Sequence, residues 1–204
     1  MPLNVRLKLG GKLYGGWQEI HIQRSIEQIA GQFSLRVTER WSGHDEPRPI
    51  RPGEECAVLI DDQPVITGYV DDVGIDYDAE SHSVSVSGRD RTGDLVDCSA
   101  PIVNWEQQTL FDVAKRLAKP FGIEVKAEVD VGARFTSRKN NPGVTVFDTL
   151  DAAAKIRAVL LVSDGLGGLV ITRASKEPLG VTLMLGKNVL SCSAIFSHKD
   201  RFKD

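Results

Sequence analysis

The stretch Gly31-Gln32-Phe33-Ser34-Leu35-Arg36-Val37 alternates polar and apolar side chains. Period-two alternation is typical of a β-strand with one buried face. The same alternation predicts further strands on both sides of this stretch, at residues 5–9, 20–22, 56–60, 65–73 and 83–87. Glycine pairs and acidic turn residues separate these runs, at 10–11, 15–16, 61–64 and 78–81. Short strands with frequent turns predict a curled, barrel-like β-domain over residues 1–104.

Two segments of this domain break the alternation. The segment Ser25–Ile29 has a serine three residues before Gln28, which is compatible with a short helix or a wide turn. The segment 42–53 contains Pro47, Pro49 and Pro52 and is expected to be a loop, because proline cannot donate to a sheet ladder.

The pattern changes from period two to a helical period at Trp105. Thr109-Leu110-Phe111-Asp112 has the threonine cap and early acid of a helix start, and that helix should end near Lys119, before Pro120. Thr145-Val146-Phe147-Asp148 repeats the phrase and predicts a second helix. Strands are expected after each helix, at 123–127 and 159–163, and a hairpin joins the latter to 169–173. Residues 105–175 are thus expected to form a two-layer α/β sandwich with two helices.

Residues 176–204 return to a β pattern, with strands expected at 181–185 and 189–195. Two strands alone leave open edges. They are expected either to join the first domain or to begin a further β-domain. The fold class expected for the whole chain is α+β.

The composition disfavours some classes of function. The 204 residues are 41% hydrophobic and 26% charged, with a net charge of −3, which is typical of a globular protein and disfavours a nucleic-acid-coating role. Cys56, Cys98 and Cys192 are widely spaced, so each is expected to be a buried thiol in a reducing compartment. The sequence has neither a signal-peptide core nor a membrane-length apolar run, so the chain is expected to be soluble and cytoplasmic when made.

Two polar clusters invite a functional interpretation. Asp164-Gly165-Leu166-Gly167-Gly168 superficially resembles a phosphate-binding loop, but it lies between two expected strands and is interpreted as a hairpin turn. The cluster Gly88–Asp94 contains Arg89 and Arg91. Its arginines either bind an anion or pair with Asp90, Asp94 or neighbouring carboxylates while Leu95 and Val96 return to the core; the second interpretation is preferred because the charges are interleaved.

Other chemistry-bearing residues form no recognisable constellation. His21, His44, His82 and His198 are scattered, and His44-Asp45-Glu46 lacks a second ligand set at zinc spacing. Asp61-Asp62 and Asp71-Asp72 are expected at turns or strand ends. We therefore predict no catalytic, cofactor-binding or metal site, no cofactor and no enzymatic activity. Trp17, Trp41 and Trp105 are expected mainly in core or domain-seam packing, with partner contact as the alternative.

Several phrases together resemble the late-control D family of phage tail proteins, the Mu-like baseplate hubs. They are Gly31–Leu35, Arg51-Pro52-Gly53, Thr67–Asp71, the nearly unbroken signature Ser81–Ala100, Pro142–Leu150 and Asn188–Ser191. The signature is specific, whereas each other phrase is weak alone. Family hubs are longer, so this chain is expected to be a fragment or the product of a truncated prophage gene, ending where a second β-domain begins.

The resemblance implies a structural subunit of a contractile phage or prophage tail. Such hubs are related to the base of type VI secretion spikes and assemble as homotrimer rings between spike and tail tube. The implied partners are the chain itself, the spike, and the tube and baseplate wedge proteins, with DNA only in transit through a lumen and no membrane. The implied location is the virion baseplate, after assembly in the bacterial cytoplasm. A glycan- or cell-wall-binding module is the alternative, followed by an unrecognised hydrolase.

Overall fold

The structure is a computed structural model that describes residues 4–38, 50–77, 82–102, 104–175, 177, 180–189 and 191–193. Trp41, His44, His198 and the expected loop up to position 49 lie outside these residues. The chain divides into two units, Met1–Ala174 and Ser175–Asp204, which are described separately.

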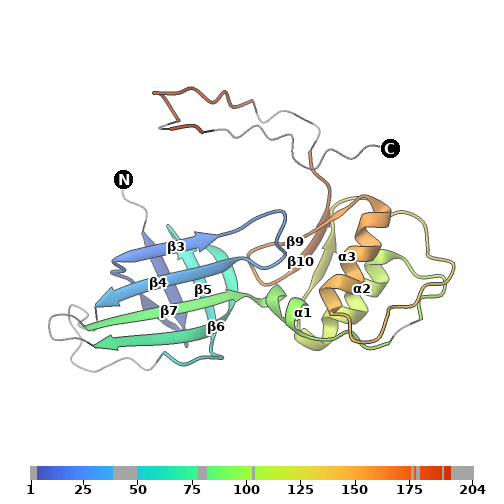
Figure 1. The fold of residues 1–204 in the computed structure, drawn as a ribbon, viewed down its shortest axis with the longest axis horizontal. Coiled ribbons are helices and arrows are strands. Elements are labelled where there is room, and N and C mark those ends of the chain that lie inside the picture. The colour runs from blue at the N-terminus through green and yellow to red at the C-terminus, as the bar shows by residue number, and fades with distance from the viewer. Residues whose placement is uncertain are drawn as a thin grey trace. The chain divides into compact units, whose positions relative to one another are not determined.

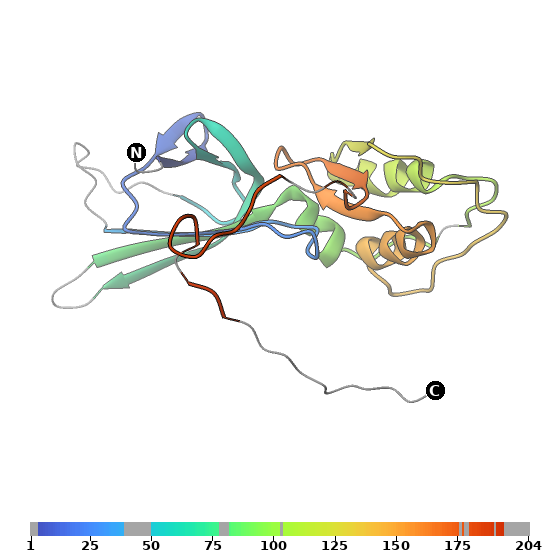
Figure 2. The same ribbon diagram turned by 90° about the horizontal axis from the view of Figure 1, so that it is seen from above.

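The first part of the larger unit is a seven-stranded sheet in which every neighbouring pair is antiparallel (Figure 1). Its strands are β1 (Val5–Leu9), β2 (Lys12–Tyr14), β3 (Glu19–Gln23), β4 (Gln32–Thr38), β5 (Glu55–Ile60), β6 (Gln63–Tyr77) and β7 (His82–Asp90). Their order is β2-β1-β5-β6-β7-β4-β3, so β2 and β3 are the two edges. Figure 2 shows the curl of this sheet. The predicted β-domain is confirmed, and β2 is a strand that the sequence pattern did not predict.

One face of the sheet carries the buried apolar side chains of a hydrophobic core. In β4, Phe33, Leu35 and Val37 are buried while Gln32, Ser34 and Arg36 are exposed, as the alternation predicts. Leu35 lies opposite Val86 of β7, and neither side chain has exposed surface. Period-two burial therefore places the apolar side chains of β4 and β7 on the same side of the sheet.

The second part of the larger unit combines two main helices with a small sheet (Figure 1). A 3₁₀ turn, η1 (Arg91–Gly93), leads into the short helix α1 (Asp94–Asp97), and α2 (Leu110–Ala118) continues into η2 (Lys119–Phe121). After β8 (Val125–Ala127) come α3 (Val146–Arg157), β9 (Leu160–Ser163) and β10 (Leu169–Thr172). The sheet order is β8-β10-β9, with β8 parallel and β9 antiparallel to β10. This is the predicted two-helix sandwich.

The repeated threonine phrase starts both helices as predicted. Thr109 Oγ1 accepts a hydrogen bond from Asp112 N (3.1 Å), and Asp112 Oδ2 accepts one from Thr109 N (3.0 Å), a complete capping box. Thr145 Oγ1 accepts a bond from Asp148 N (3.0 Å) in the same way. Gly122 follows η2 with φ +66°, a left-handed conformation that glycine adopts readily.

A separate apolar cluster holds the helical part together. Its members include Trp105, which has no exposed surface, together with Leu95 and Ala100 from the end of the signature and Ile29 from the segment after β3. The core interpretation of Trp105 is confirmed, and Trp17 is half-buried against the other cluster. Val96 was expected to return to the core with Leu95, but it is exposed because α1 turns only one side inward.

Two further expectations need comment. The segment Ser25–Ile29 forms bends rather than a helix, as in the turn alternative. The strands expected at 181–185 and 189–195 are wrong over the described residues, where an isolated bridge pairs Leu185 with Val189; positions 190 and 194–195 lie outside them. Val181, Leu183 and Leu185 are highly exposed, so this segment lacks the burial that stabilises a strand. Within the described chain no helix is long and apolar enough to cross a bilayer.

Candidate functional site

The signature sequence forms the turn that carries the chain from the β-sheet into the helical part. β7 ends at Asp90, η1 and α1 follow immediately, and the cluster Gly88–Asp94 spans this change of direction. Thr92 N donates a hydrogen bond to Asp90 Oδ1 (3.5 Å), and Thr92 Oγ1 donates one to the Ile29 carbonyl (2.9 Å). Thr92 has no exposed surface, so these bonds hold the turn from inside.

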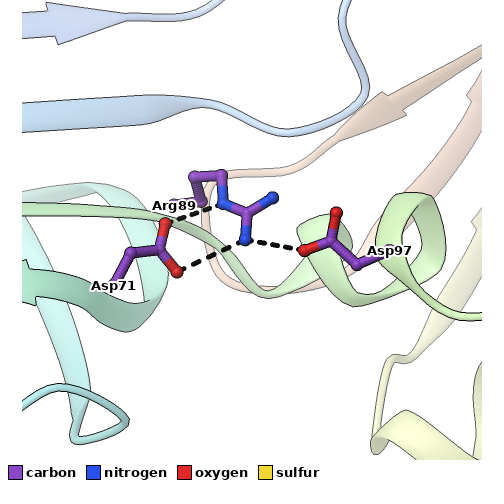
Figure 3. Close-up of polar contacts among 3 residues, drawn as sticks. All are labelled: Asp71, Arg89 and Asp97. Carbon is purple, nitrogen blue, oxygen red and sulfur yellow. Dashed lines mark hydrogen bonds and ion pairs between the residues drawn. The ribbon is translucent and has the colours of Figure 1, made fainter.

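Arg89 joins three elements on the outside of the turn. Its Nε donates to Asp71 Oδ2 of β6 (2.7 Å), and its Nη2 donates to Asp97 Oδ2 of α1 (2.7 Å) (Figure 3). Both carboxylates stabilise the guanidinium and raise the pKa of Arg89, and the hydrogen bond from Arg89 lowers the pKa of Asp97. Arg89 therefore links α1 to strand β6 of the sheet through two ion pairs.

Arg91 points to a different carboxylate. Its Nη2 lies 3.3 Å from Glu55 Oε1 of β5, and its guanidinium lies 5.7 Å from the centre of the Tyr69 ring. Both arginines of the cluster are thus paired with carboxylates of the chain itself, as the structural interpretation of Gly88–Asp94 predicts, although the partners are Asp71, Asp97 and Glu55 and not the expected Asp90 or Asp94.

Asp90 is buried and reaches across to the β9–β10 hairpin. Ser163 Oγ donates a hydrogen bond to Asp90 Oδ2 (2.6 Å), and Arg24 Nη2 donates one to the Ser163 carbonyl (2.7 Å). Burial raises the pKa of Asp90, although the bond from Ser163 and the charge of Arg24 oppose the shift. Thr67 Oγ1 adds a bond to the Gly165 carbonyl (3.0 Å). This polar set joins the sheet to the helical part.

The loop 164–168 is a hairpin turn, as predicted. Asp164 Oδ1 accepts hydrogen bonds from Leu166 N (2.7 Å) and Gly168 N (2.8 Å). The carboxylate of the turn itself therefore occupies the two backbone N–H groups that would donate to a bound anion. Gly165 and Gly167 have φ values of +79° and +88°, which explains the glycines at these two positions.

We expect the Arg89–Asp97 pair to stabilise the chain weakly and in a pH-dependent way. In a double-mutant cycle of Arg89→Ala and Asp97→Ala, the coupling energy at neutral pH should be about 0.5 kcal/mol, because both side chains are more than a third exposed. Since the folded pKa of Asp97 is lowered from 3.8, this contribution is complete above that value and disappears as the pH falls below it.

Urea unfolding at several pH values measures this coupling. The same cycle between Asp97 and Arg116, a cation of α2 that makes no ion pair with the described residues, should give no coupling. A coupling between Arg89 and Asp97 that is unchanged at low pH would contradict the ionic origin.

The remaining candidate residues stay dispersed. Among the described residues, no group of three or more histidine, cysteine, aspartate or glutamate side chains is placed to hold a metal. Asp61 and Asp62 form the predicted turn, where Asp62 pairs with Arg6. Asp71 and Asp72 were expected at a turn or strand end, which is wrong: they lie inside β6, beside a bulge in its pairing with β7.

The cysteines divide into two environments. Cys56 is buried as expected, and burial together with the charge of Asp71 raises its pKa to about 12. Cys98 and Cys192 were also expected to be buried, but both are exposed. Cys98 is the residue directly after α1 and has an extended backbone conformation. His21 lies on the edge strand β3.

Two members of the polar set, Arg24 and Ser163, could not be found from the sequence. They are 139 residues apart, and each lies in a segment with no unusual composition. In contrast, the unusual charge density around Arg89 marked that residue in advance, although not its partner Asp71.

Comparison with known proteins separates the same two parts. Residues 4–90 match the family described as Mu phage baseplate assembly protein GpP-like, N-terminal domain. Residues 92–173 match the second domain of the baseplate hub protein gp44-like family. The whole chain is 34% identical to the baseplate hub protein gp44 of Escherichia phage Mu, and it covers 54% of that protein. The chain therefore spans about half the length of this curated relative.

Solved structures agree with this match. The 43 kDa tail protein of prophage MuSo2 from Shewanella oneidensis is 45% identical, with a TM-score of 0.85 over 92% of this chain and 59% of that one. A tail protein from Neisseria meningitidis MC58 is 31% identical, with a TM-score of 0.75 over 84% of this chain and 50% of that one.

A more distant likeness extends the fold to secretion systems. The E. coli c3393 protein, a component of the type VI secretion system, has a TM-score of 0.50 at 8% identity, over 83% of this chain and 44% of that one, which concerns the fold alone. The two consecutive domain matches and the Mu relative agree with one another. The chain belongs to the family of Mu-like baseplate hub proteins of phage and prophage tails.

Proposed function

We propose that this chain is a non-enzymatic structural subunit that forms a homotrimeric ring in a contractile tail, between the spike and the tail tube. The observation that carries the proposal is the pair of consecutive matches, of residues 4–90 to a baseplate assembly protein domain and of residues 92–173 to a baseplate hub protein domain. Its partners would be further copies of itself, the spike, and the tube and wedge proteins. It would act in the virion baseplate after assembly in the bacterial cytoplasm, with DNA passing through a central lumen.

The β-sheet offers two different surfaces that such a ring needs. A cyclic trimer is built from heterologous contacts, in which one surface of each copy meets a different surface of the next. The edges β2 and β3 are such a pair: Leu13 on β2 is 49% exposed and Ile20 on β3 is 46% exposed. Open edges with exposed apolar side chains favour pairing with another chain. These features support a ring closed through the sheet edges.

Light scattering on the chain at increasing concentration tests the ring. The expected mass at high concentration is three times 22.3 kDa. Ile20→Lys should shift the equilibrium to the monomer, because it places a charge on the edge. Ile156→Lys is the matched control, since Ile156 is 59% exposed but lies on helix α3 and on neither sheet edge. A chain that stays monomeric at every concentration would contradict the proposed ring contacts.

The glycan-binding alternative lacks support in the helical part. A module of that kind would bind its ligand through a row of exposed aromatic side chains. Phe135 is buried, and Phe111, Phe121 and Phe147 are partly buried against the apolar cluster around Trp105. These rings contribute to the core and leave no aromatic platform among the described residues of this part.

A further inference from the structure

The small sheet of the helical part has its edges at β9 and β8. At the β9 edge, Arg24 donates a hydrogen bond to the Ser163 carbonyl, and Thr67 donates one to the Gly165 carbonyl of the hairpin. On the other side, β8 pairs with β10 through Leu169 N to the Glu124 carbonyl (2.8 Å) and Glu128 N to the Ile171 carbonyl (3.0 Å). Successive residues of a strand point their backbone groups to opposite sides. The N–H and C=O groups of Val125 and Ala127 therefore face away from β10, and no described residue bonds to them.

A groove runs beside this free edge. One wall is the flank of α2 that carries Asp112, Lys115, Arg116 and Lys119, and the other wall is the segment 122–125 that leads into β8. Its volume is about 590 Å³, within the range of pockets that bind small ligands and short peptides. Ile123 and Val125 are almost fully buried along the base, so the groove has an apolar floor and a charged rim.

The lining residues carry a net positive charge, because the three cations Lys115, Arg116 and Lys119 outnumber the two carboxylates of Asp112 and Glu124. Asp112 is engaged in the capping box with Thr109, which also lowers its pKa. Lys115 lies 5.5 Å from the centre of the Phe111 ring. Arg116 and Lys119 are exposed and make no ion pair with the described residues. Both cations lie near the C-terminal end of α2, where they interact favourably with the helix dipole. Both remain available to pair with a ligand.

We infer that this groove binds an extended, acidic peptide segment of a partner protein, which adds as a fourth strand beside β8 and pairs its carboxylates with Arg116 and Lys119. Strand addition uses main-chain hydrogen bonds for affinity and side-chain pockets for specificity. The free N–H and C=O groups of Val125 and Ala127 supply the main-chain hydrogen bonds, and the cations of α2 supply the specificity. The inference does not depend on ring formation, because one copy of the chain contains the whole groove.

A peptide fits these features better than a nucleic acid does. Single-stranded nucleic acids are held by a basic track together with aromatic side chains on which the bases stack. The groove contains no aromatic residue in its lining. A free strand edge offers alternating donors and acceptors, which match another polypeptide backbone, whereas a phosphate group supplies acceptors only.

Fluorescence polarisation on the full 204-residue chain tests the inference with three labelled nine-residue peptides. The first alternates valine with glutamate, the second replaces glutamate with lysine, and the third keeps glutamate but carries N-methyl groups on every second backbone nitrogen. We expect the glutamate peptide to bind at least about tenfold more tightly than the other two, because either change removes one of the two sources of binding. In ¹⁵N spectra the amides of Val125 and Ala127 should shift on its addition.

Charge reversal gives the matched control. The double variant Arg116→Glu and Lys119→Glu should reverse the preference toward the lysine peptide, while Lys155→Glu, on the exposed face of α3, should leave it unchanged. The inference is overturned if none of the peptides binds below millimolar concentration, if N-methylation has no effect, or if the shifted amides lie away from β8. Tighter binding of a single-stranded oligonucleotide to the same residues would also overturn it.

Discussion

Gly88→Ala is expected to cost about 3 kcal/mol of unfolding free energy, at the upper end of the range for overpacked cores. Gly88 lies on β7 opposite Phe33, and a Cβ atom there would lie 2.7 Å from Phe33 Cζ and still closer to the Tyr69 carbonyl oxygen. A backbone oxygen cannot move aside without breaking the β6–β7 ladder, so the added methyl group must displace a whole strand. Urea unfolding followed by far-ultraviolet circular dichroism measures the loss.

Gly15→Ala is the matched control for this substitution. Gly15 also lies in the β-domain, and its nearest neighbour would be Arg6 Cγ at 3.7 Å, an ordinary contact distance. Its substitution should change stability by less than about 1 kcal/mol. Equal losses at positions 88 and 15 would contradict the close approach of β6 and β7.

Trp105→Ala is expected to cost about 3–5 kcal/mol, the usual range for removing a large buried aromatic side chain. Trp105 has no exposed surface, its ring lies 5.8 Å from that of Phe135, and the Arg138 guanidinium lies 5.6 Å from its centre. Removal of the indole leaves a cavity where the 128–144 loop packs on the helices. Thermal and urea unfolding measure the change.

Trp105→Phe separates ring packing from the indole N–H group. Trp105 Nε1 is buried without a hydrogen-bond partner in the described chain, so the loss of that N–H should cost little and the phenyl ring should retain most of the packing. We expect a loss of about 1–2 kcal/mol for Trp105→Phe. Ile102→Ala, at a nearby side chain that is 59% exposed, should be almost neutral. A loss as large for phenylalanine as for alanine would contradict this account.

Local sequence signals predicted most of the elements. The alternation around Phe33 predicted β4, and the threonine caps at Thr109 and Thr145 predicted the starts of α2 and α3. Each signal acts within a few residues, because it reflects burial of one strand face or hydrogen bonding in one helical turn. The strands expected at 181–185 and 189–195 failed because an apolar alternation specifies a strand only when another surface buries it.

The candidate site was predicted in part. The signature drew attention to Arg89 and Arg91, and the expected pairing of both arginines with carboxylates of the chain was confirmed. Their partners Asp71 and Glu55 were not identified, because strand pairing and the bulge in β6 decide which carboxylate lies opposite each arginine. The sequence analysis also failed to predict that Val96 and Cys98 are exposed, because a one-turn helix is too short to show a helical period in the sequence.

By itself, the sequence determined most of the strands, the two main helices and where they begin, and, through the signature 81–100, the family. Tertiary structure alone decided that Asp90 meets Ser163, that β6 and β7 approach too closely for a side chain at Gly88, and that β8 keeps a free edge beside α2. The physical reason is the distance along the sequence over which each kind of interaction acts. Periodicity and capping depend on neighbours a few residues away, whereas these contacts join groups up to 73 residues apart that only the folded chain brings together.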